Sequence, residues 1–133
     1  MQGSGLNQMR GIIPRSIEKV MEACAHLSTQ GWEYHLQVSF LEIYNETIRD
    51  LLLKPSKNEP LKLHIKQKSV NSKLLYVSDL TMVDVSTIDQ IDGLMERASR
   101  QRSVGSTDMN AQSSRSHSVF TLYITGEFLL CIK

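Results

Sequence analysis

The residues from Asn110 to His117 carry most of the chemistry that the sequence suggests. The run Asn-Ala-Gln-Ser-Ser-Arg-Ser-His places two amides, three hydroxyls and a guanidinium in one polar stretch, just before a β-like run at 119–125. Hydroxyls can bind Mg²⁺ or orient a water molecule, and a guanidinium matches the geometry of a carboxylate or a phosphate. The stretch therefore suits a polyphosphate site. The sequence has no G-x-x-x-x-G-K-[ST] motif to hold the phosphates, so it offers half of such a site.

Length and composition indicate one globular domain of ordinary polarity. The 133 residues are 41% hydrophobic and 22% charged, and the formal net charge is +1. So small a charge gives no overall basic field for nucleic acid or for a membrane surface. No apolar run is long enough to cross a bilayer, and the N-terminus has no signal-peptide core. Cys24 and Cys131 lack metal-ligand spacing, which favours reduced thiols.

Helical and strand-like periodicities alternate along the chain and predict an α/β layer structure. Helices are expected over 13–28 and from 88 to about 102, and strands over 33–44, 61–65, 74–85 with a bend at 78–79, and 119–125. Asn45 is expected to cap a short helical turn that runs to Leu53. Ser86 and Asp89 are expected to form the capping box of the second helix. Glu42 has no spaced acid partner, so a structural hydrogen bond is favoured over general-acid chemistry.

Four stretches, in order along the chain, resemble the kinesin motor domain. Asn110-x-x-Ser-Ser-Arg-Ser-His117 resembles its switch I signature. The other three resemble the start of the helix after the P-loop, a central strand with the turn that follows it, and the end of the tubulin-facing loop region. They are Gly11-Ile-Ile-Pro-Arg15, Ser39-Phe-Leu-Glu-Ile-Tyr-Asn-Glu-Thr-Ile-Arg-Asp-Leu-Leu52 and Tyr76-Val-Ser-Asp-Leu80. Ser28-Thr-Gln-Gly-Trp32 and Arg102-Ser-Val-Gly105 most resemble the C-terminal-motor, minus-end-directed kinesins, plant members included.

The resemblance implies a partial P-loop NTPase fold of the kinesin type, in which helices flank a central sheet. It covers residues 1–126, and residues 127–133 are interpreted as an apolar tail outside the family pattern. Two origins fit such a tail, intron read-through or an alternative exon. The sequence contains neither the P-loop of the family nor its switch II Asp-x-x-Gly-x-Glu. The chain is therefore expected to be the middle of a motor domain.

The resemblance also implies roles for individual residues. Asn110 would position groups at the γ-phosphate, and Ser113 and Ser114 would contact the nucleotide and order the attacking water, with Ser114 as a Mg²⁺ ligand. Arg115 would pair with the switch II glutamate and close the site. ATP and Mg²⁺ are thus the implied cofactors. Catalysis in such a site acts by positioning and charge stabilisation.

The lysine-rich stretch 54–73 has two interpretations. It holds one acid, Glu59, against six lysines, which are Lys54, Lys57, Lys62, Lys66, Lys68 and Lys73. One interpretation is an exposed, solvated loop, which is what most charge runs are. The kinesin resemblance instead implies a secondary, salt-sensitive contact with the acidic tubulin surface through Lys62, Lys66 and Lys68. Nucleic acid fits less well, because the lysines lack interleaved aromatic residues for stacking.

Three functions stay open for the polypeptide. The first is a fragment of an ATP-dependent microtubule motor, located in the cytoplasm on the microtubule cytoskeleton. The second is a non-catalytic fragment that binds tubulin or another motor. The third is a pseudogene-like truncated product without a stable function. Microtubules are the expected partner, and neither nucleic acid nor a membrane is expected.

The isolated 133-residue chain is expected not to hydrolyse ATP measurably. Switch I residues complete a site only when a P-loop already supplies backbone N–H groups and a lysine to the phosphates. Phosphate release in the presence of microtubules should therefore equal that of buffer. Turnover that Arg115→Ala abolishes would contradict this prediction and reveal another phosphate site in the chain.

Overall fold

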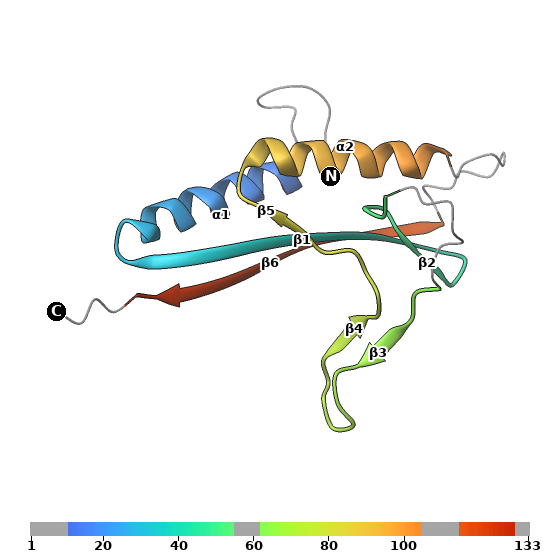
Figure 1. Ribbon diagram of the computed structural model, residues 1–133. Coiled ribbons are helices and arrows are strands. Elements are labelled where there is room, and N and C mark those ends of the chain that lie inside the picture. Colours follow the sequence, from blue (N-terminus) through green and yellow to red (C-terminus); the bar gives the residue numbers. More distant parts are fainter. Residues whose placement is uncertain (1–10, 55–61, 105–114, 130–133) are drawn as a thin grey trace.

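The computed structural model describes residues 11–54, 62–104 and 115–129, and within these ranges the chain forms helices on one face of an antiparallel sheet. The elements in chain order are α1 (Ile12–Ser28), β1 (Trp32–Tyr44), β2 (Thr47–Asp50), β3 (Ile65–Gln67), β4 (Leu75–Val77), β5 (Val83–Val85), α2 (Ile88–Val104) and β6 (Ser116–Phe128). Both helices lie on the same side of the sheet, and the β3–β4 hairpin projects from the other side (Figure 1). The predicted α/β layer structure is confirmed.

The central strand of the larger sheet is β1. Along one edge it pairs with β6 over its whole length, from Trp32 opposite Phe128 to Tyr44 opposite Ser116. Along its other edge, residues 36–38 pair with β5 and residues 41–44 pair with β2. Every strand that contacts β1 does so antiparallel, and β3 with β4 forms a separate two-stranded sheet.

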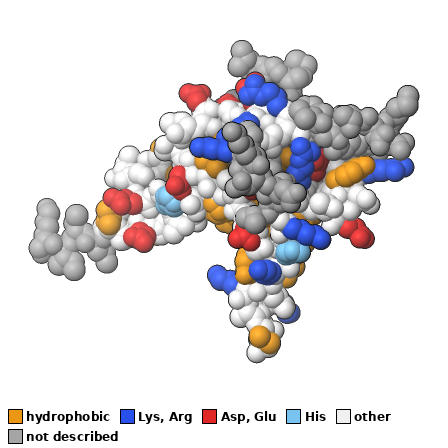
Figure 2. All heavy atoms as spheres, turned by 45° about the vertical axis from the view of Figure 1, so that its right-hand side comes forward, with side chains coloured by type: hydrophobic (Ala, Val, Ile, Leu, Met, Phe, Trp, Pro, Cys, Tyr) orange, Lys and Arg blue, Asp and Glu red, His pale blue; other side chains and the backbone are white. Residues whose placement is uncertain are grey.

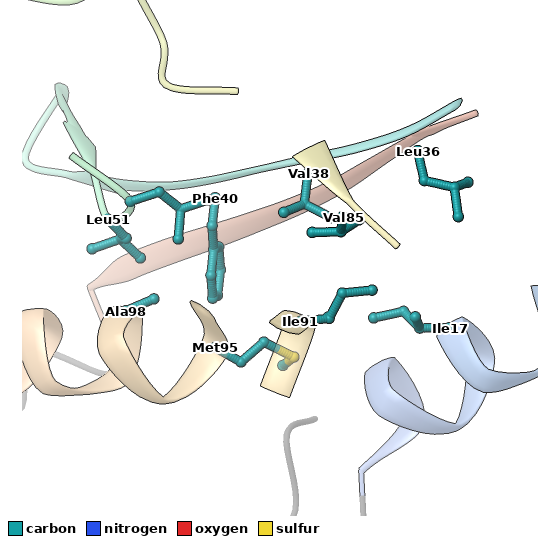
Figure 3. Packing of buried hydrophobic residues seen from close by; sticks show 10 residues of the cluster. Ile17, Leu36, Val38, Phe40, Leu51, Val85, Ile91, Met95 and Ala98 are labelled. Atoms are coloured by element: carbon teal, nitrogen blue, oxygen red, sulfur yellow. The ribbon is translucent and has the colours of Figure 1, made fainter. Parts of the chain in front are cut away.

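The hydrophobic core fills the space between the sheet and the two helices (Figure 3). Alternate residues of β1 point into it, and the spacing of 91, 95 and 98 supplies one apolar face of α2. The labelled members of this cluster are Ile17, Leu36, Val38, Phe40, Leu51, Val85, Ile91, Met95 and Ala98. Phe40 also packs edge-to-face on Phe120 of β6, with ring centroids 5.5 Å apart.

No helix in the described ranges combines the length and the apolar character that a membrane span requires.

The predicted helical turn from Asn45 to Leu53 is wrong, because these residues form a β-hairpin with β1. Asn45 and Glu46 have φ of 48° and 61°, and Tyr44 pairs directly with Thr47. A two-residue loop with both φ values positive matches the right-handed twist of the flanking strands. Asn tolerates that conformation well, and the β-branched Thr47 and Ile48 continue as a strand.

The segment between β2 and α2 differs in part from its prediction. The strand expected over 61–65 begins at Ile65 and runs to Gln67, while Leu61 lies outside the described residues. The expected bend in 74–85 is confirmed, since a turn at Ser78 and Asp79 separates β4 from β5. Asp79 has a φ of 60° at this turn. The two strands then join different sheets, which hydropathy alternation alone does not reveal.

The second helix begins with a capping box, but one residue later than predicted. The Gln90 side-chain oxygen accepts the backbone N–H of Thr87 at 3.3 Å, and the Thr87 hydroxyl accepts the backbone N–H of Gln90 at 3.4 Å. The same Gln90 oxygen also accepts the backbone N–H of Ser86 at 2.8 Å. The box is therefore Thr87 with Gln90, in place of Ser86 with Asp89. Its Thr-x-x-Gln spacing fits the general pattern, in which an amide or carboxylate of a longer side chain reaches back to the cap.

The last strand is longer than the predicted 119–125 and includes Glu127 and Phe128. The Phe128 ring lies 5.3 Å from that of Trp32, and the backbone N–H of Leu129 donates to the Gly31 carbonyl at 2.9 Å. A Cβ at Gly126 would lie 2.7 Å from the Tyr34 ring, so a larger residue at this position would require the ring to shift. The boundary expected after Gly126 therefore falls inside β6.

The outer edge of β6 has no strand partner among the described residues. The strand is 13 residues long and contains neither lysine nor proline, which are the residues that commonly protect an exposed edge. Val119, Tyr123 and Ile124 are 43%, 42% and 47% exposed. Such an edge offers unpaired backbone N–H and C=O groups to any other strand.

The isolated chain is expected to associate through this edge and to melt without one sharp transition. Light scattering should detect species larger than the 15.1 kDa monomer. Tyr123→Lys places a charge on the edge strand and should reduce association, whereas the matched Gln30→Lys in the turn after α1 should not. A monodisperse monomer with a single cooperative melt would show that the edge needs no cover.

Candidate functional site

The predicted switch I residues lie in the sequence between the end of α2 at Val104 and the first residues of β6, which begins at Ser116. Asn110, Ser113 and Ser114 lie outside the described residues. Arg115 directly precedes β6, its side chain is exposed, and it makes no hydrogen bond or ion pair with another described residue. A guanidinium in this setting can pair with a carboxylate or a phosphate that a ligand or another part of the protein supplies.

A buried ion pair lies at the same junction, between Arg102 near the end of α2 and Glu42 in β1. Arg102 Nε donates to Glu42 Oε1 at 3.0 Å, and Arg102 Nη2 donates to the hydroxyl of Ser116 at 3.4 Å. The Glu42 side chain is 1% exposed and that of Arg102 is 30% exposed. The prediction that Glu42 has a structural role is confirmed in this respect, because its carboxylate joins β1 to α2.

The buried Glu42 carboxylate depends on Arg102 for charge compensation. Glu42 Oε2 is buried and has no hydrogen-bond partner among the described residues. A buried carboxylate is costly unless an opposite charge and hydrogen bonds compensate its lost hydration. The Arg102 guanidinium is the cation that does so within the part of the chain that the structure describes.

The C-terminal half of α2 is attached to the end of the β1–β2 hairpin by side chains that bind backbone carbonyls. Arg97 donates to the carbonyl of Leu52, and Gln101 donates to that of Leu53 at 3.1 Å. In return Arg49 donates to the carbonyl of Gln101 at 2.9 Å. That carbonyl lies in the last turn of α2, where the helix offers no N–H partner and where a cation is favourable. Sequence analysis missed this network; its signal is the four-residue spacing of Arg97 and Gln101, which places both on one helical face.

A second missed residue, Asp50, organises the chain after β2. Its side chain is buried and accepts three backbone N–H groups, from Leu52 at 2.9 Å, Leu53 at 3.2 Å and Thr81 at 2.8 Å. A carboxylate that receives several backbone donors can be buried without a cation. Asp50 therefore joins the segment that leaves β2 to the segment that enters β5.

The lysines expected to meet tubulin lie on the exposed β3–β4 projection. Lys66 in β3 pairs with Tyr76, and the backbone N–H of Lys68 donates to the Leu74 carbonyl at 3.0 Å. Because directly paired residues of antiparallel strands point to the same side, Lys66 and Tyr76 share one face of the hairpin, and Lys68 directly follows β3. Lys62 lies before the strand and is also exposed. Figure 2 shows basic and hydrophobic side chains together on this projection.

The charge on this projection is one-sided. The sequence from Lys62 to Ser78 contains four lysines, the fourth being Lys73, and no aspartate or glutamate. Apolar side chains accompany them, with Val70 93% and Leu75 66% exposed. The prediction of an exposed basic segment is therefore confirmed for the described residues, which include the β3–β4 hairpin.

Comparison with known proteins assigns the family. The kinesin motor domain family model matches residues 1–129. The chain belongs to the kinesin motor domain family. Kinesin-like protein KIN-14D of Arabidopsis thaliana is 47% identical over 129 residues, a match that covers 90% of this chain and 16% of that protein. Carboxy-terminal kinesin 2 of Xenopus laevis is 48% identical over 120 residues, covering 88% of this chain and 18% of that protein.

The fold agrees with solved kinesin structures. A KIF14 dimer in a two-heads-bound state, with AMP-PNP and in complex with a microtubule, matches with a TM-score of 0.76 at 39% identity. The match covers 97% of this chain and 35% of that one. The predicted resemblance to the C-terminal-motor kinesins, plant members included, is confirmed by these relatives. The chain spans 16% and 18% of the length of the two curated relatives, so it corresponds to a part of the kinesin motor domain.

Proposed function

We propose that this chain forms part of an ATP-driven microtubule motor and contributes the switch I side of its nucleotide site. The observation that carries the proposal is the kinesin motor domain match over residues 1–129, with the switch I signature at the α2–β6 junction. The neighbouring solved structure in complex with a microtubule supports the same partner for this chain. A location on the microtubule cytoskeleton, within the cytoplasm, follows from that partner.

In this proposal, the residues around the junction would bind ATP and Mg²⁺. The donor set fits: Ser113 and Ser114 offer hydroxyl oxygens for the cation, and Asn110 offers an amide to the γ-phosphate side. Arg115 is exposed and has no ion-pair partner among the described residues, so its guanidinium can meet a group of opposite charge. When bound, Mg²⁺ would neutralise phosphate charge, and these side chains would hold the nucleotide and a water molecule in orientation.

Turnover needs groups that the 133 residues do not contain. The sequence has no P-loop lysine motif and no switch II Asp-x-x-Gly-x-Glu, so Arg115 has no family partner within it. The proposed role in catalysis is therefore a contribution to a site completed by other segments. The chain is therefore expected to contribute switch I residues to a nucleotide site and to have no ATPase activity by itself.

The β3–β4 hairpin is proposed as a tubulin contact. Four lysines, with no aspartate or glutamate between residues 62 and 78, lie on an exposed projection and complement an acidic protein surface. The hairpin lies on the opposite side of the sheet from both helices (Figure 1). Binding there would not use the switch I residues. This independence favours a second candidate function, a non-catalytic fragment that binds tubulin without turnover.

A chimera tests the motor proposal directly. Residues 1–129 would replace the matching segment of a C-terminal kinesin relative whose microtubule-stimulated ATP turnover has first been measured. We expect the chimera to retain turnover within about tenfold of its parent, and Arg115→Ala to lower it by at least about a hundredfold. Arg15→Ala, an exposed arginine on α1, is the matched control and should leave turnover unchanged. A folded chimera that binds microtubules but turns over no ATP would refute the motor proposal.

Reversal of charge on the hairpin tests the tubulin contact. The triple variant Lys62→Glu, Lys66→Glu, Lys68→Glu should weaken microtubule co-sedimentation of the 133-residue chain by about tenfold, since three exposed contacts are reversed. Binding of the unaltered chain should also fall as salt rises.

The matched control for this test reverses three exposed cations on the helices, with Arg15→Glu, Lys19→Glu and Arg100→Glu. It changes the net charge equally and should leave binding within about twofold of the unaltered chain. Equal losses in both triple variants would mean that net charge, and not the hairpin, governs binding. Undiminished pelleting of the hairpin variant at high salt would exclude this surface as the contact.

A further inference from the structure

We propose that Arg102 is a positioning residue that holds the start of β6, and with it Arg115, at a fixed place relative to α2 and β1. The inference rests on the proposed function, because Arg115 is a site residue only if the chain serves a nucleotide site. It concerns three described side chains, those of Glu42, Arg102 and Ser116, which together are called the Arg102 link. Arg102 in α2 contacts Glu42 in β1 and Ser116 in β6 through one guanidinium.

One guanidinium makes both contacts of the Arg102 link. Its Nε donates to Glu42 Oε1 at 3.0 Å, and its Nη2 donates to the Ser116 hydroxyl at 3.4 Å. The planar, rigid shape of the guanidinium fixes the angle between the two donors. The position of Ser116 is thereby coupled to that of the Glu42 carboxylate, and not only to its backbone partner Tyr44 in β1.

Burial of Glu42 keeps the Arg102 link in place. The carboxylate is 1% exposed and sits in the central strand, so its position is set by the whole sheet. With Oε2 lacking a described partner, movement of Arg102 away from Glu42 would leave a buried charge uncompensated. Arg102 is therefore held by Glu42, and its second donor is directed at Ser116.

The sequence separation explains why such a link matters. Arg102 and Ser116 are 14 residues apart, and Arg115 is the residue next to Ser116. Arg115 lies directly before the start of β6, where β1 is the only strand neighbour among the described residues. Strand ends fray readily, so a charge-assisted side-chain bond at the first residue of β6 restricts the direction in which Arg115 departs.

Two conservative variants separate positioning from general stabilisation. Arg102→Lys can still pair with Glu42 but has no fork to reach Ser116, and Ser116→Ala removes only the acceptor hydroxyl. In the 133-residue chain, both should raise amide hydrogen exchange at residues 116–118 by about fivefold. Exchange at residues 121–125 in the middle of β6 should stay unchanged. Ser118→Ala is the matched control, since Ser118 lies on the same face of β6 without a bond to Arg102.

A double variant covers the case in which a change simply unfolds the chain. Arg102→Met should destabilise strongly because it leaves Glu42 buried and unpaired, and Glu42→Met with Arg102→Met should recover much of that loss. The double variant should nevertheless keep the fast exchange at residues 116–118, because the contact with Ser116 is still missing. Slow exchange there in the refolded double variant would overturn the inference.

The chimera described above adds a readout that a purely structural role would not change. Arg102→Lys and Ser116→Ala should each lower its kcat by about tenfold while the KM for ATP changes less than twofold. Faster exchange at residues 116–118 with an unchanged kcat would overturn the positioning role. If the unaltered chimera has no turnover, the proposed function fails, and hydrogen exchange alone then decides whether Arg102 holds β6.

Discussion

The pairing of β1 with β6 is the interaction on which the rest of the structure depends. It joins residues 32–44 to residues 116–128 in one continuous register, and the other edge of β1 receives β5 and β2. Alternate side chains of both strands then form the apolar face on which α1 and α2 pack. The same register sets Ser116 opposite Tyr44 and brings it within reach of Arg102. Loss of this pairing would remove the core and the α2–β6 junction together.

Polar interactions, in contrast, concentrate at the end of α2. There the side chains of Arg49, Arg97 and Gln101 donate hydrogen bonds to backbone carbonyls. Arg102 compensates the charge of the buried Glu42 carboxylate. Apolar packing alone leaves a helix free to shift along its axis, whereas such directional contacts do not. In the proposed motor this is the end of the helix from which switch I departs. The basic β3–β4 hairpin projects from the side of the sheet opposite to α2 (Figure 1).

Two errors of the sequence analysis have simple local causes. Asn45 is a good N-cap residue, which favours a helix at Asn45-Glu46 in the sequence analysis. Asn is equally common in two-residue hairpin turns, and Asn45 and Glu46 form such a turn with positive φ. At the start of α2, Ser86 and Thr87 are both good caps. Only Gln90, which is long enough to reach back to the backbone, selects Thr87. In each case a neighbouring residue decided between two local structures of similar propensity.

The sequence by itself determined the helices and strands with strong periodicity, the exposed basic segment and the motif Asn110 to His117, because these depend on residue type and spacing along the chain. The kinesin family followed from the same motifs and was confirmed by comparison. Only the tertiary structure decided that Glu42 pairs with Arg102, 60 residues away, and that the Asp50 carboxylate accepts a hydrogen bond from the backbone N–H of Thr81. Such pairs depend on sheet register and helix placement. Those are set by the packing of the whole chain, and local spacing carries no signal for them.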